Sequence, residues 1–383
     1  MRRLLLLVCS IVLVDTVFYA ALVPLLPHYA DEFDLSKTGA GILVAAYAAG
    51  ALIGAIPGGI AAARYGPRRA VLFGLTLMGA ASLGFGFAGD PWTLGAARFV
   101  QGFGSALSWG GALAWLIAGT PRARRGEMLG TAMGAAIFGA LLGPALGALA
   151  EQVGPRPVFV GFAGVAAAFI VWALRTPAAD AEGASVAALV RTAREPQIAG
   201  ACWLMVLPAL LFGVLAVLVP LELDDVGWTP AAIAAVFIGS AALEMFVAPL
   251  LGRFSDRRGR FLPLRLALGG AALATAGLAL ADRPAVLVPL VVAAAISFGA
   301  FWAPAMAFLA DAAERLGLAQ GLAFGLMNAA WGLGNTAGPS LGGALADAAG
   351  DALPYALMAA LCASTLFALH TLGTRAVRVP ETP

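Results

Sequence analysis

Apolar runs of about 20 residues, each long enough to cross a bilayer as one helix, recur along almost the whole chain of 383 residues. Only 11% of the residues are charged, whereas a typical soluble domain has about 25%. A chain of this composition could bury a large core, but it could not cover that core with a polar surface. We therefore predict an all-α membrane protein that crosses the bilayer many times.

The predicted spans number twelve, and most of the connections between them are short. Their bounds are 4–27, 38–63, 70–89, 91–118, 128–150, 157–174, 197–221, 230–252, 261–281, 285–310, 321–346 and 353–372. A polar segment divides them six and six, and its middle, 184–192, could form a short surface helix. The predicted parts are an N-terminal six-helix half (1–174), a cytoplasmic linker (175–196) and a C-terminal six-helix half (197–383).

Two glycine-rich stretches, 130–148 and 325–343, repeat the same design 195 positions apart. The matching positions are Gly139, Gly143, Pro144 and Gly147 in the first stretch and Gly334, Gly338, Pro339 and Gly342 in the second. Small residues at these spacings let a second helix approach the backbone closely, which is a main source of helix association in lipid. The repeat predicts two related halves, with a closely packed, bendable helix from each at the interface between them.

Arginine and lysine divide unequally between the two sides of the predicted membrane protein. Nineteen arginines fall on the side of both termini and the linker, and only Lys37, Arg156 and Arg283 fall on the other. Because cytoplasmic loops are enriched in these residues, both termini are predicted to be cytoplasmic. The excess of arginine over lysine suggests a GC-rich bacterial genome, so we expect a multi-pass protein of the bacterial inner (plasma) membrane.

Asp15, Arg98 and Glu244 lie well inside the predicted spans, where a charge at the bilayer centre costs about 2.5–3.5 kcal/mol on insertion scales and is usually functional. Asp15 lies mid-way along the first span with Tyr19 on its face, and we predict a functional site there; a structural pairing with Arg98 is the alternative. Glu244, mid-way along the eighth span, is predicted to line a cavity and carry protons, or else to be a hydrogen-bonded structural acid. Arg98 could equally do no more than hold the first helix in place.

Polar and aromatic residues mark two later spans. Asn328, Trp331 and Asn335 share one face of the eleventh span, at positions i, i+3 and i+7. Trp302 in the tenth span could add aromatic surface for an organic cation, and plain packing is the alternative.

Two loops carry a second repeated pattern, GIAAARYGPRR at 59–69 and GRFSDRRGR at 252–260, and a helix opens with RFVQGFGSA at 98–106. The residues of interest in these loops are Gly59, Arg64, Gly66 and Arg68 in the first copy and Gly252, Asp256, Arg257, Gly259 and Arg260 in the second. Together with the Gly-Pro helices, these motifs resemble the signatures of the major facilitator superfamily, and more narrowly of its drug/proton antiporters and vesicular amine transporters.

The resemblance implies a role for each motif. The paired loops would form a cytoplasmic latch between the halves, although Ala63 stands where the first copy usually has an aspartate. The Gly-Pro helices would be the antiporter motif, Asp15 would meet a cationic substrate or a proton, and Arg98 would take part in proton coupling. Asn328 and Gly299 stand where amine transporters often have aspartates, which leaves Asp15 and Glu244 as the protonatable candidates.

Several classes of function lack their motifs in this sequence. It contains no phosphate-binding GxxxxGK[ST] and no HExxH, and its two histidines lie at opposite ends of the predicted bundle. We therefore expect no enzyme, no metal and no cofactor, and the formal net charge of +2 gives no indication of nucleic acid binding.

The predicted function is secondary active transport by alternating access, with proton-coupled export (multidrug efflux) of small organic, lipophilic or cationic compounds. The expected partners are substrate, protons and the lipid bilayer, and the expected oligomeric state is a monomer. An exporter or facilitator of a neutral metabolite such as a sugar is the first alternative. A membrane sensor or scaffold that transports nothing is the alternative of another class.

Overall fold

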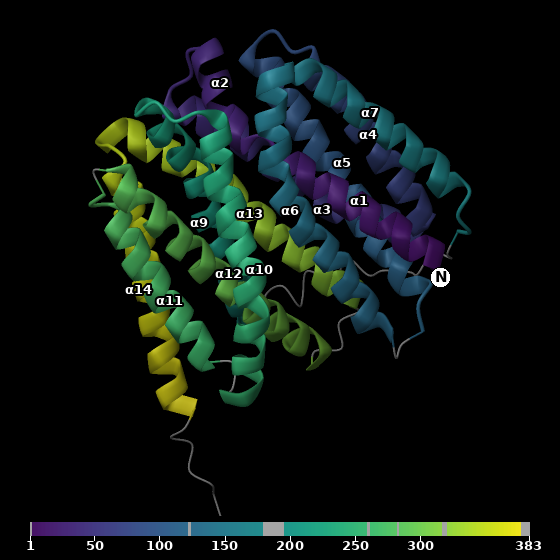
Figure 1. The fold of residues 1–383 in the computed structure, drawn as a ribbon. Helices are drawn as coiled ribbons and strands as arrows, with labels where there is room; N and C mark the ends of the chain where they lie inside the picture. Colours follow the sequence, from purple (N-terminus) through teal and green to yellow (C-terminus); the bar gives the residue numbers. More distant parts are fainter. Residues whose placement is uncertain are drawn as a thin grey trace, which may run out of the picture.

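The computed structural model describes residues 2–121, 124–178, 195–258, 261–281, 283–315 and 320–376. Within these residues the chain forms twelve long helices, which Figure 1 shows as one bundle. They are α1 (Arg2–Ala20), α3 (Lys37–Tyr65), α4 (Pro67–Gly86), α5 (Pro91–Ala118), α6 (Arg125–Val153), α7 (Pro155–Leu174), α9 (Pro196–Asp225), α10 (Pro230–Arg258), α11 (Phe261–Leu278), α12 (Pro284–Arg315), α13 (Gln320–Ala349) and α14 (Ala352–Ala376). The all-α prediction is therefore confirmed.

Each long helix covers one of the predicted spans, and nine helices in the described residues are long and apolar enough to cross a membrane. The first span differs from the prediction at its outer end. There α1 stops at Ala20, and a 3-10 turn (η1, Val23–Leu25) and a short helix (α2, Leu26–Glu32) follow. Pro24 and Pro27 lie in the first turns of these two elements, because a proline ring is tolerated at a helix start and disrupts a helix interior. The surface helix predicted at 184–192 lies outside the described residues.

The boundaries between helices follow from local chemistry. The carboxylate of Asp90 caps α5 by accepting hydrogen bonds from the amides of Trp92 (2.9 Å) and Thr93 (3.0 Å). The hydrogen bonds from Thr93 hold the pKa of Asp90 below its usual value. Gly66 joins α3 to α4 with a φ of +89°, a left-handed conformation that glycine adopts without strain.

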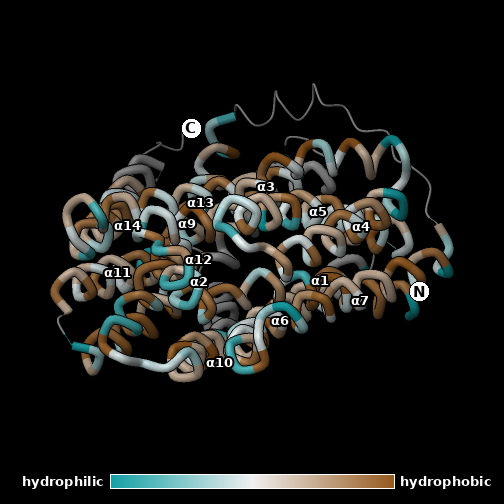
Figure 2. The backbone as a smooth tube through the Cα atoms, turned by 90° about the horizontal axis from the view of Figure 1, so that it is seen from above, coloured by the Kyte–Doolittle hydropathy of each residue, from teal (hydrophilic) through white to brown (hydrophobic). Residues whose placement is uncertain are grey.

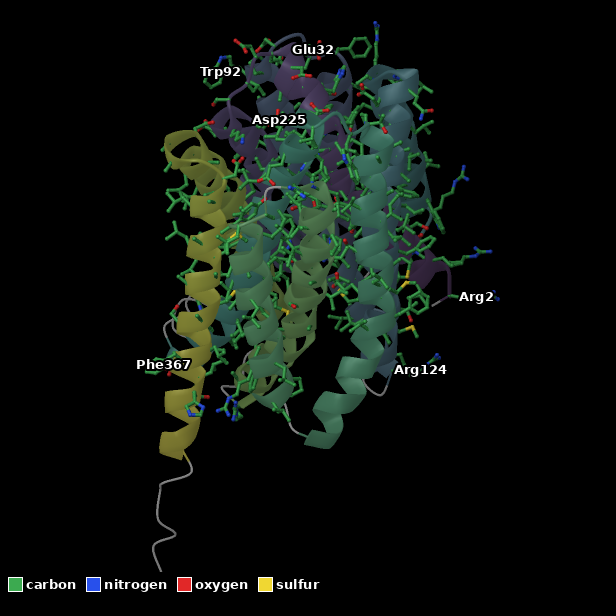
Figure 3. The ribbon with its side chains drawn as sticks, turned by 60° about the vertical axis from the view of Figure 1, so that its left-hand side comes forward. Arg2, Glu32, Trp92, Arg124, Asp225 and Phe367 are labelled. Carbon is green, nitrogen blue, oxygen red and sulfur yellow. The ribbon has the colours of Figure 1, made fainter. Side chains whose placement is uncertain are left out.

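The outer faces of the bundle are strongly apolar. Trp92, Leu273 and Phe367 expose 85%, 76% and 71% of their surface, and Figure 3 shows Trp92 and Phe367 pointing away from the helices. In Figure 2 the brown, apolar positions extend along the rim helices as well as the centre. Large exposed apolar surfaces of this kind mark contact with another apolar phase, which for helices of this length is the lipid bilayer.

Charge divides between the two ends of the bundle. Figure 3 shows Glu32 and Asp225 at one end and Arg2 and Arg124 toward the other. We call the end with Glu32 and Asp225 the acidic end. It carries α2 and a pocket of about 450 Å³ that is lined by Pro27, His28, Asp31, Glu32, Glu151, Asp224 and Pro230.

The helices before and after the linker lie on opposite sides of the bundle (Figure 1). One large apolar core runs through both sets, but the earlier helices contribute to it mainly residues near the acidic end, such as Phe18, Leu25 and Phe159. Away from that end, Leu7, Trp115 and Ala173 belong to a separate core made by the earlier helices alone. The two sets are therefore joined by apolar packing at the acidic end.

Within each set, one glycine row packs against the first helix of its own set. A Cβ added to Gly139 of α6 would lie 2.5 Å from the carbonyl oxygen of Leu13 in α1. In the second set, Gly338 of α13 packs in the same way against the backbone of Leu210 in α9. The glycines of the rows predicted to lie between the halves therefore pack within their own set, although α13 does contact the other set, in part through the carbonyl of Pro339.

The most extensive contact between the two sets is made by α3 and α13, backbone against backbone, and α6 and α10 also touch. Gly41 lies against the carbonyl of Pro339, and Gly343 lies against the carbonyl of Lys37. Further along, a Cβ on Gly332 would lie 3.0 Å from the Cβ of Leu52. Any side chain at these glycines would push the two helices apart, so the halves meet closely because the sequence has no side chain there.

Candidate functional site

The carboxylate of Asp15 is buried among α1, α3 and α5, with 5% of the residue exposed. Tyr47 Oη donates a hydrogen bond to Oδ1 at 3.0 Å, and Ser105 Oγ donates one to Oδ2 at 2.8 Å. Tyr47 reaches this carboxylate because α3 and α5 pack through glycines: Gly102 lies directly against the carbonyl of Tyr47, and Gly50 against that of Phe99. Both bonds are donated to the acid, which suits an ionised carboxylate.

Arg98 of α5 is almost completely buried, with 1% exposed, and its guanidinium lies 4.7 Å from the ring centroid of Tyr47. It donates hydrogen bonds at 3.4 Å to the carbonyls of Phe18 and Tyr19 and to Oε1 of Gln101. Among the ion pairs of the described residues there is none between Arg98 and Asp15. Tyr47 touches both groups, so it connects the buried charges that the sequence suggested might pair directly.

A second set of contacts crosses between α1 and α13. Tyr19 Oη donates a hydrogen bond to Oδ1 of Asn335 at 2.7 Å. The Tyr19 ring lies 5.3 Å, centroid to centroid, from both Trp331 and Tyr47. Tyr19 and Trp331, predicted separately, therefore form one cluster with the Asp15 site, and Asn335 joins them. Asn328 is half-buried two turns earlier in α13 and makes none of these contacts.

Glu244 lies apart from this cluster, half-buried in the middle of α10. Its carboxyl packs on α12 at Gly299, where a Cβ would overlap Oε1 and Cδ and lie 2.8 Å from Cγ. No hydrogen bond or ion pair to the Glu244 carboxyl occurs within the described part of the chain. Trp302 follows in the same helix α12, and its side chain is outside the described set.

A small cavity of about 20 Å³ adjoins Asp15 between α1, α4 and α7. Ser82 is the other polar residue of its lining, and the remaining walls are apolar: Ile11, Val14, Phe18, Leu75, Met78, Phe162, Ala166 and Phe169. A space of this size is enough for about one water molecule. The side of Asp15 that faces away from α13 is therefore nearly closed.

The predicted cytoplasmic latch is described only in its first copy. Arg64 lies exposed beside the ring of Tyr65, at 5.8 Å, and Gly59 has open space around it. Arg68 Nη2 donates a hydrogen bond to the carbonyl of Leu174 at the end of α7, within the same half. In the second copy, the side chains of Asp256 and Arg257 and the residues Gly259 and Arg260 are not described, and neither are the surroundings of Gly252.

Arg68 has a counterpart that sequence reasoning did not find. Arg265, near the start of α11, donates its Nη2 hydrogen to the carbonyl of Leu369 in α14 at 3.3 Å. Leu174 and Leu369 are 195 positions apart, the same offset that relates the two glycine rows. Leu174 is the last residue of α7, so its carbonyl has no partner in its own helix, whereas Leu369 lies two turns before the end of α14. In each half, an arginine of an earlier helix thus donates an equivalent hydrogen bond to the last helix.

The family model of the Major Facilitator Superfamily matches residues 8–323 and 209–383. The chain belongs to this superfamily of membrane transporters, as its motifs predicted. It is 32% identical over 169 residues to a protein named probable vesicular acetylcholine transporter-B from Danio rerio, a match that covers 42% of this chain and 34% of that protein. It is 26% identical over 271 residues to the uncharacterized MFS-type transporter YcaD of Escherichia coli, covering 69% of each.

Solved structures share the fold at low sequence identity. The xylose transporter XylE from E. coli, in a partially occluded inward open conformation, superposes with a TM-score of 0.77 at 15% identity over 99% of both chains. A bacterial homolog of the human lysosomal transporter Spinster, inward-facing and unoccupied, gives 0.71 at 16% identity, covering 96% of this chain and 94% of that one. These likenesses establish a major facilitator fold.

Proposed function

We propose that this transporter exports small organic, lipophilic or cationic compounds in exchange for protons, by alternating access. The observation that carries the proposal is the buried carboxylate of Asp15, which accepts two hydrogen bonds in the membrane-spanning part of α1. A carboxylate at this depth is costly and usually marks an ion or substrate pathway. Its own location, closed in by α3 and α5, suits a proton better than a bulky compound.

The topology belongs to the same proposal. All twelve long helices would span the membrane, with both termini and the linker 175–196 in the cytoplasm between halves 1–174 and 197–383. The acidic end would then lie outside, and the joined halves there would leave the site open to the cytoplasm. We place the protein as a monomer in the bacterial inner membrane.

Proton binding would act through Tyr47. A protonated Asp15 carries one O–H donor, and the oxygen that holds the proton is a weaker acceptor than a carboxylate oxygen, so the hydrogen bond from Tyr47 or Ser105 would weaken. Tyr47 belongs to α3, the helix that contacts α13 across the two sets. Binding or release of the proton would therefore change the hydrogen bonding of Tyr47. Its helix, α3, has to separate from α13 when the site opens outward.

The substrate would contact the aromatic side of the cluster. Tyr19 and Trp331 lie edge to face, 5.3 Å apart, and their π-faces attract organic cations when water is excluded. Glu244 would be a second proton-carrying carboxylate in the other half, Arg98 would modulate Asp15 through Tyr47, and Asn328 and Trp302 would line the cavity further along. The latch and antiporter motifs would serve the rocking of the halves.

The experiment uses purified protein in liposomes that hold a trapped pH dye. Organic cations added one at a time should trigger proton movement in the wild type, and Asp15→Asn should abolish it while the protein remains folded in the membrane. A mutant that moves protons as the wild type does would refute the role of Asp15.

A neutral substrate is the second candidate, favoured by the hydroxyl and amide of Tyr19 and Asn335, which meet at 2.7 Å across the halves. Such groups hydrogen-bond neutral polar solutes such as sugars, and XylE, which shares the fold, is a xylose transporter. Counterflow of a labelled sugar, with no response to cations, would favour this candidate. No flux of any solute, together with capture of a defined partner, would favour the sensor or scaffold.

A further inference from the structure

Gly299 of α12 is a place where the fold makes room for one carboxyl group. A Cβ at this position would overlap Oε1 and Cδ of Glu244 and lie 2.8 Å from its Cγ, so the carboxyl fills the space that a side chain at 299 would take. A glycine inside a helix destabilises it by roughly a factor of four to five in equilibrium constant relative to alanine. A glycine at this position therefore needs a structural or functional explanation.

The helix α12 is fixed on both sides of this glycine. Phe298 and Phe301 are completely buried, and Phe298 packs edge to face on Phe212 of α9 with ring centroids 5.4 Å apart. Glu244 is half-buried on α10 between two exposed residues, Leu243 and Met245, and its carboxyl is at the end of a flexible side chain. A side chain introduced at 299 would consequently displace the Glu244 carboxyl and leave α12 in place.

We propose that Gly299 is a positioning residue that seats the carboxyl of Glu244 against α12. The inference rests on the proposed role of Glu244 in proton transport and adds the residue that sets where this carboxyl lies. It follows that the carboxyl could be supplied from either helix, because an aspartate at 299 opposite a glycine at 244 would occupy the same space.

The test combines transport with chemical labelling of the carboxyl. Glu244→Gly should lower substrate-triggered proton movement by about 100-fold, the usual contribution of a proton-transfer group. Adding Gly299→Asp should restore most of it, and adding Gly299→Asn, which has the same shape without the acid, should not. The labelling arm follows modification of Glu244 by a hydrophobic carbodiimide with mass spectrometry, and Gly299→Ala, which displaces the carboxyl from α12, should raise its rate.

Each outcome decides the inference. Equal activity of the Asp and Asn double variants, in a wild type that moves protons, overturns it. If the wild type moves no protons with any compound, the proposed function fails and the labelling arm decides alone: an unchanged or lower rate in Gly299→Ala overturns the inference, and a raised rate supports it.

A second inference comes from the acidic end, where Lys37 and two aspartates join the halves. Lys37 Nζ lies 2.7 and 2.6 Å from the two oxygens of Asp351, in the loop before α14. Asp347, in the last turn of α13, accepts hydrogen bonds from the amides of Lys37 (3.1 Å) and Thr38 (2.7 Å) and from the Thr38 hydroxyl (2.5 Å). One half thus supplies the acid that satisfies the first amides of a helix in the other.

We infer that these residues form a charge clamp that favours the state in which the two halves are joined at the acidic end. The charge clamp consists of Lys37, Thr38, Asp347 and Asp351. Free amides at a helix start attract negative charge, and the bidentate ion pair adds to this attraction. The side chains of Lys37 and Asp351 are 27% and 29% exposed, so the pair is partly screened by water. The clamp is expected to bias the equilibrium several-fold and to come apart in each transport cycle.

Lys37 also supplies the probe, because it is the one lysine of the sequence. An amine-reactive reagent can modify Lys37 and the N-terminal amine alone, so mass spectrometry of the Lys37 peptide reports whether its ammonium is paired. Asp351→Asn should raise the modification rate about threefold, whereas Arg283→Asp, a charge change at an exposed loop residue, should not. An unchanged rate in Asp351→Asn would overturn the inference.

Spin-label distances test the conformational part. Labels at the exposed positions Asp34 and Asp225, one in each half, are introduced after Cys9, Cys202 and Cys362 are replaced by serine. Lys37→Asp should increase the population of long distances, and adding Asp351→Lys should restore the short ones. Identical distance distributions in the single variant and the parent would refute the clamp.

Discussion

Tyr47 Oη and Asp15 Oδ1 are joined by a hydrogen bond of 3.0 Å, which links α3 to α1 inside the first half. The ring of the same tyrosine lies below the Arg98 guanidinium and beside Tyr19. Tyr47 therefore contacts the acid, the arginine and the aromatic cluster at once.

We predict that Tyr47→Phe shifts the pH dependence of transport without preventing folding. The hydroxyl donates to the carboxylate and so favours its ionised form. Its loss should make Asp15 hold a proton to higher pH, and the pH of half-maximal substrate-triggered proton release should rise by about one unit. Proton release from proteoliposomes across a pH series measures this. Tyr65→Phe, at an exposed tyrosine, is the control and should leave the profile in place.

Arg98→Lys is expected to be strongly destabilising although it keeps the charge. The guanidinium reaches the carbonyls of Phe18 and Tyr19 and stacks over Tyr47 at once, and an ammonium lacks the planar fork that this requires. The cost of a buried cation with lost partners is about 3 kcal/mol. Thermal unfolding in detergent should show a clearly lower midpoint than the wild type. A midpoint equal to that of the wild type would mean that these contacts contribute little.

The hydrogen bond between Tyr19 and Asn335 should behave as one unit in a double-mutant cycle. Tyr19→Phe and Asn335→Ala each remove the bond across the halves, so the double variant should lose no more than the larger single effect. We expect each single change to alter the substrate exchange rate by about fivefold. Strictly additive effects would show that the two residues act separately.

Arg68→Gln and Arg265→Gln should lower stability by similar amounts, because both arginines bind the carbonyl of a leucine in the last helix of their half. A hydrogen bond to a charged donor contributes about 1.5–3 kcal/mol. Thermal unfolding of each single variant measures the loss, with Arg69→Gln at an exposed neighbour as the control. If only Arg68→Gln destabilises, the two halves are not fastened alike.

The twelve helices could be predicted because bilayer thickness sets their length and each span is apolar along almost all of it. The outer end of the first span could not, since Pro24 and Pro27 signal a break and leave open whether a turn or a second helix follows. Asp15, Arg98 and Glu244 were identifiable as single charges in apolar runs. Tyr47, which contacts both Asp15 and Arg98, was not, because it lies in an alanine-rich span and carries no charge to single it out.

A single sequence does not show which residues far apart along the chain contact each other. Lys37 was used only to assign the side of the membrane, and nothing in its surroundings indicated that Asp351 would meet it from 314 positions away. The latch arginines were expected to act between the halves, and no feature of the sequence indicated that Arg68 would bind the carbonyl of Leu174 within its own half. The repeat at 195 positions relates Leu174 to Leu369, but it does not show that an arginine binds each carbonyl.

The contact of α3 with α13 has a mechanical consequence. Gly41, Gly332 and Gly343 put main chain against main chain, so these glycines place no side chain between the two helices. Interdigitated side chains have to change rotamer before two helices can move, whereas helices that meet through glycines can tilt or slide without such changes. The two helices can therefore move past each other with little repacking of side chains. The charge clamp at the acidic end then decides which of their relative positions is favoured.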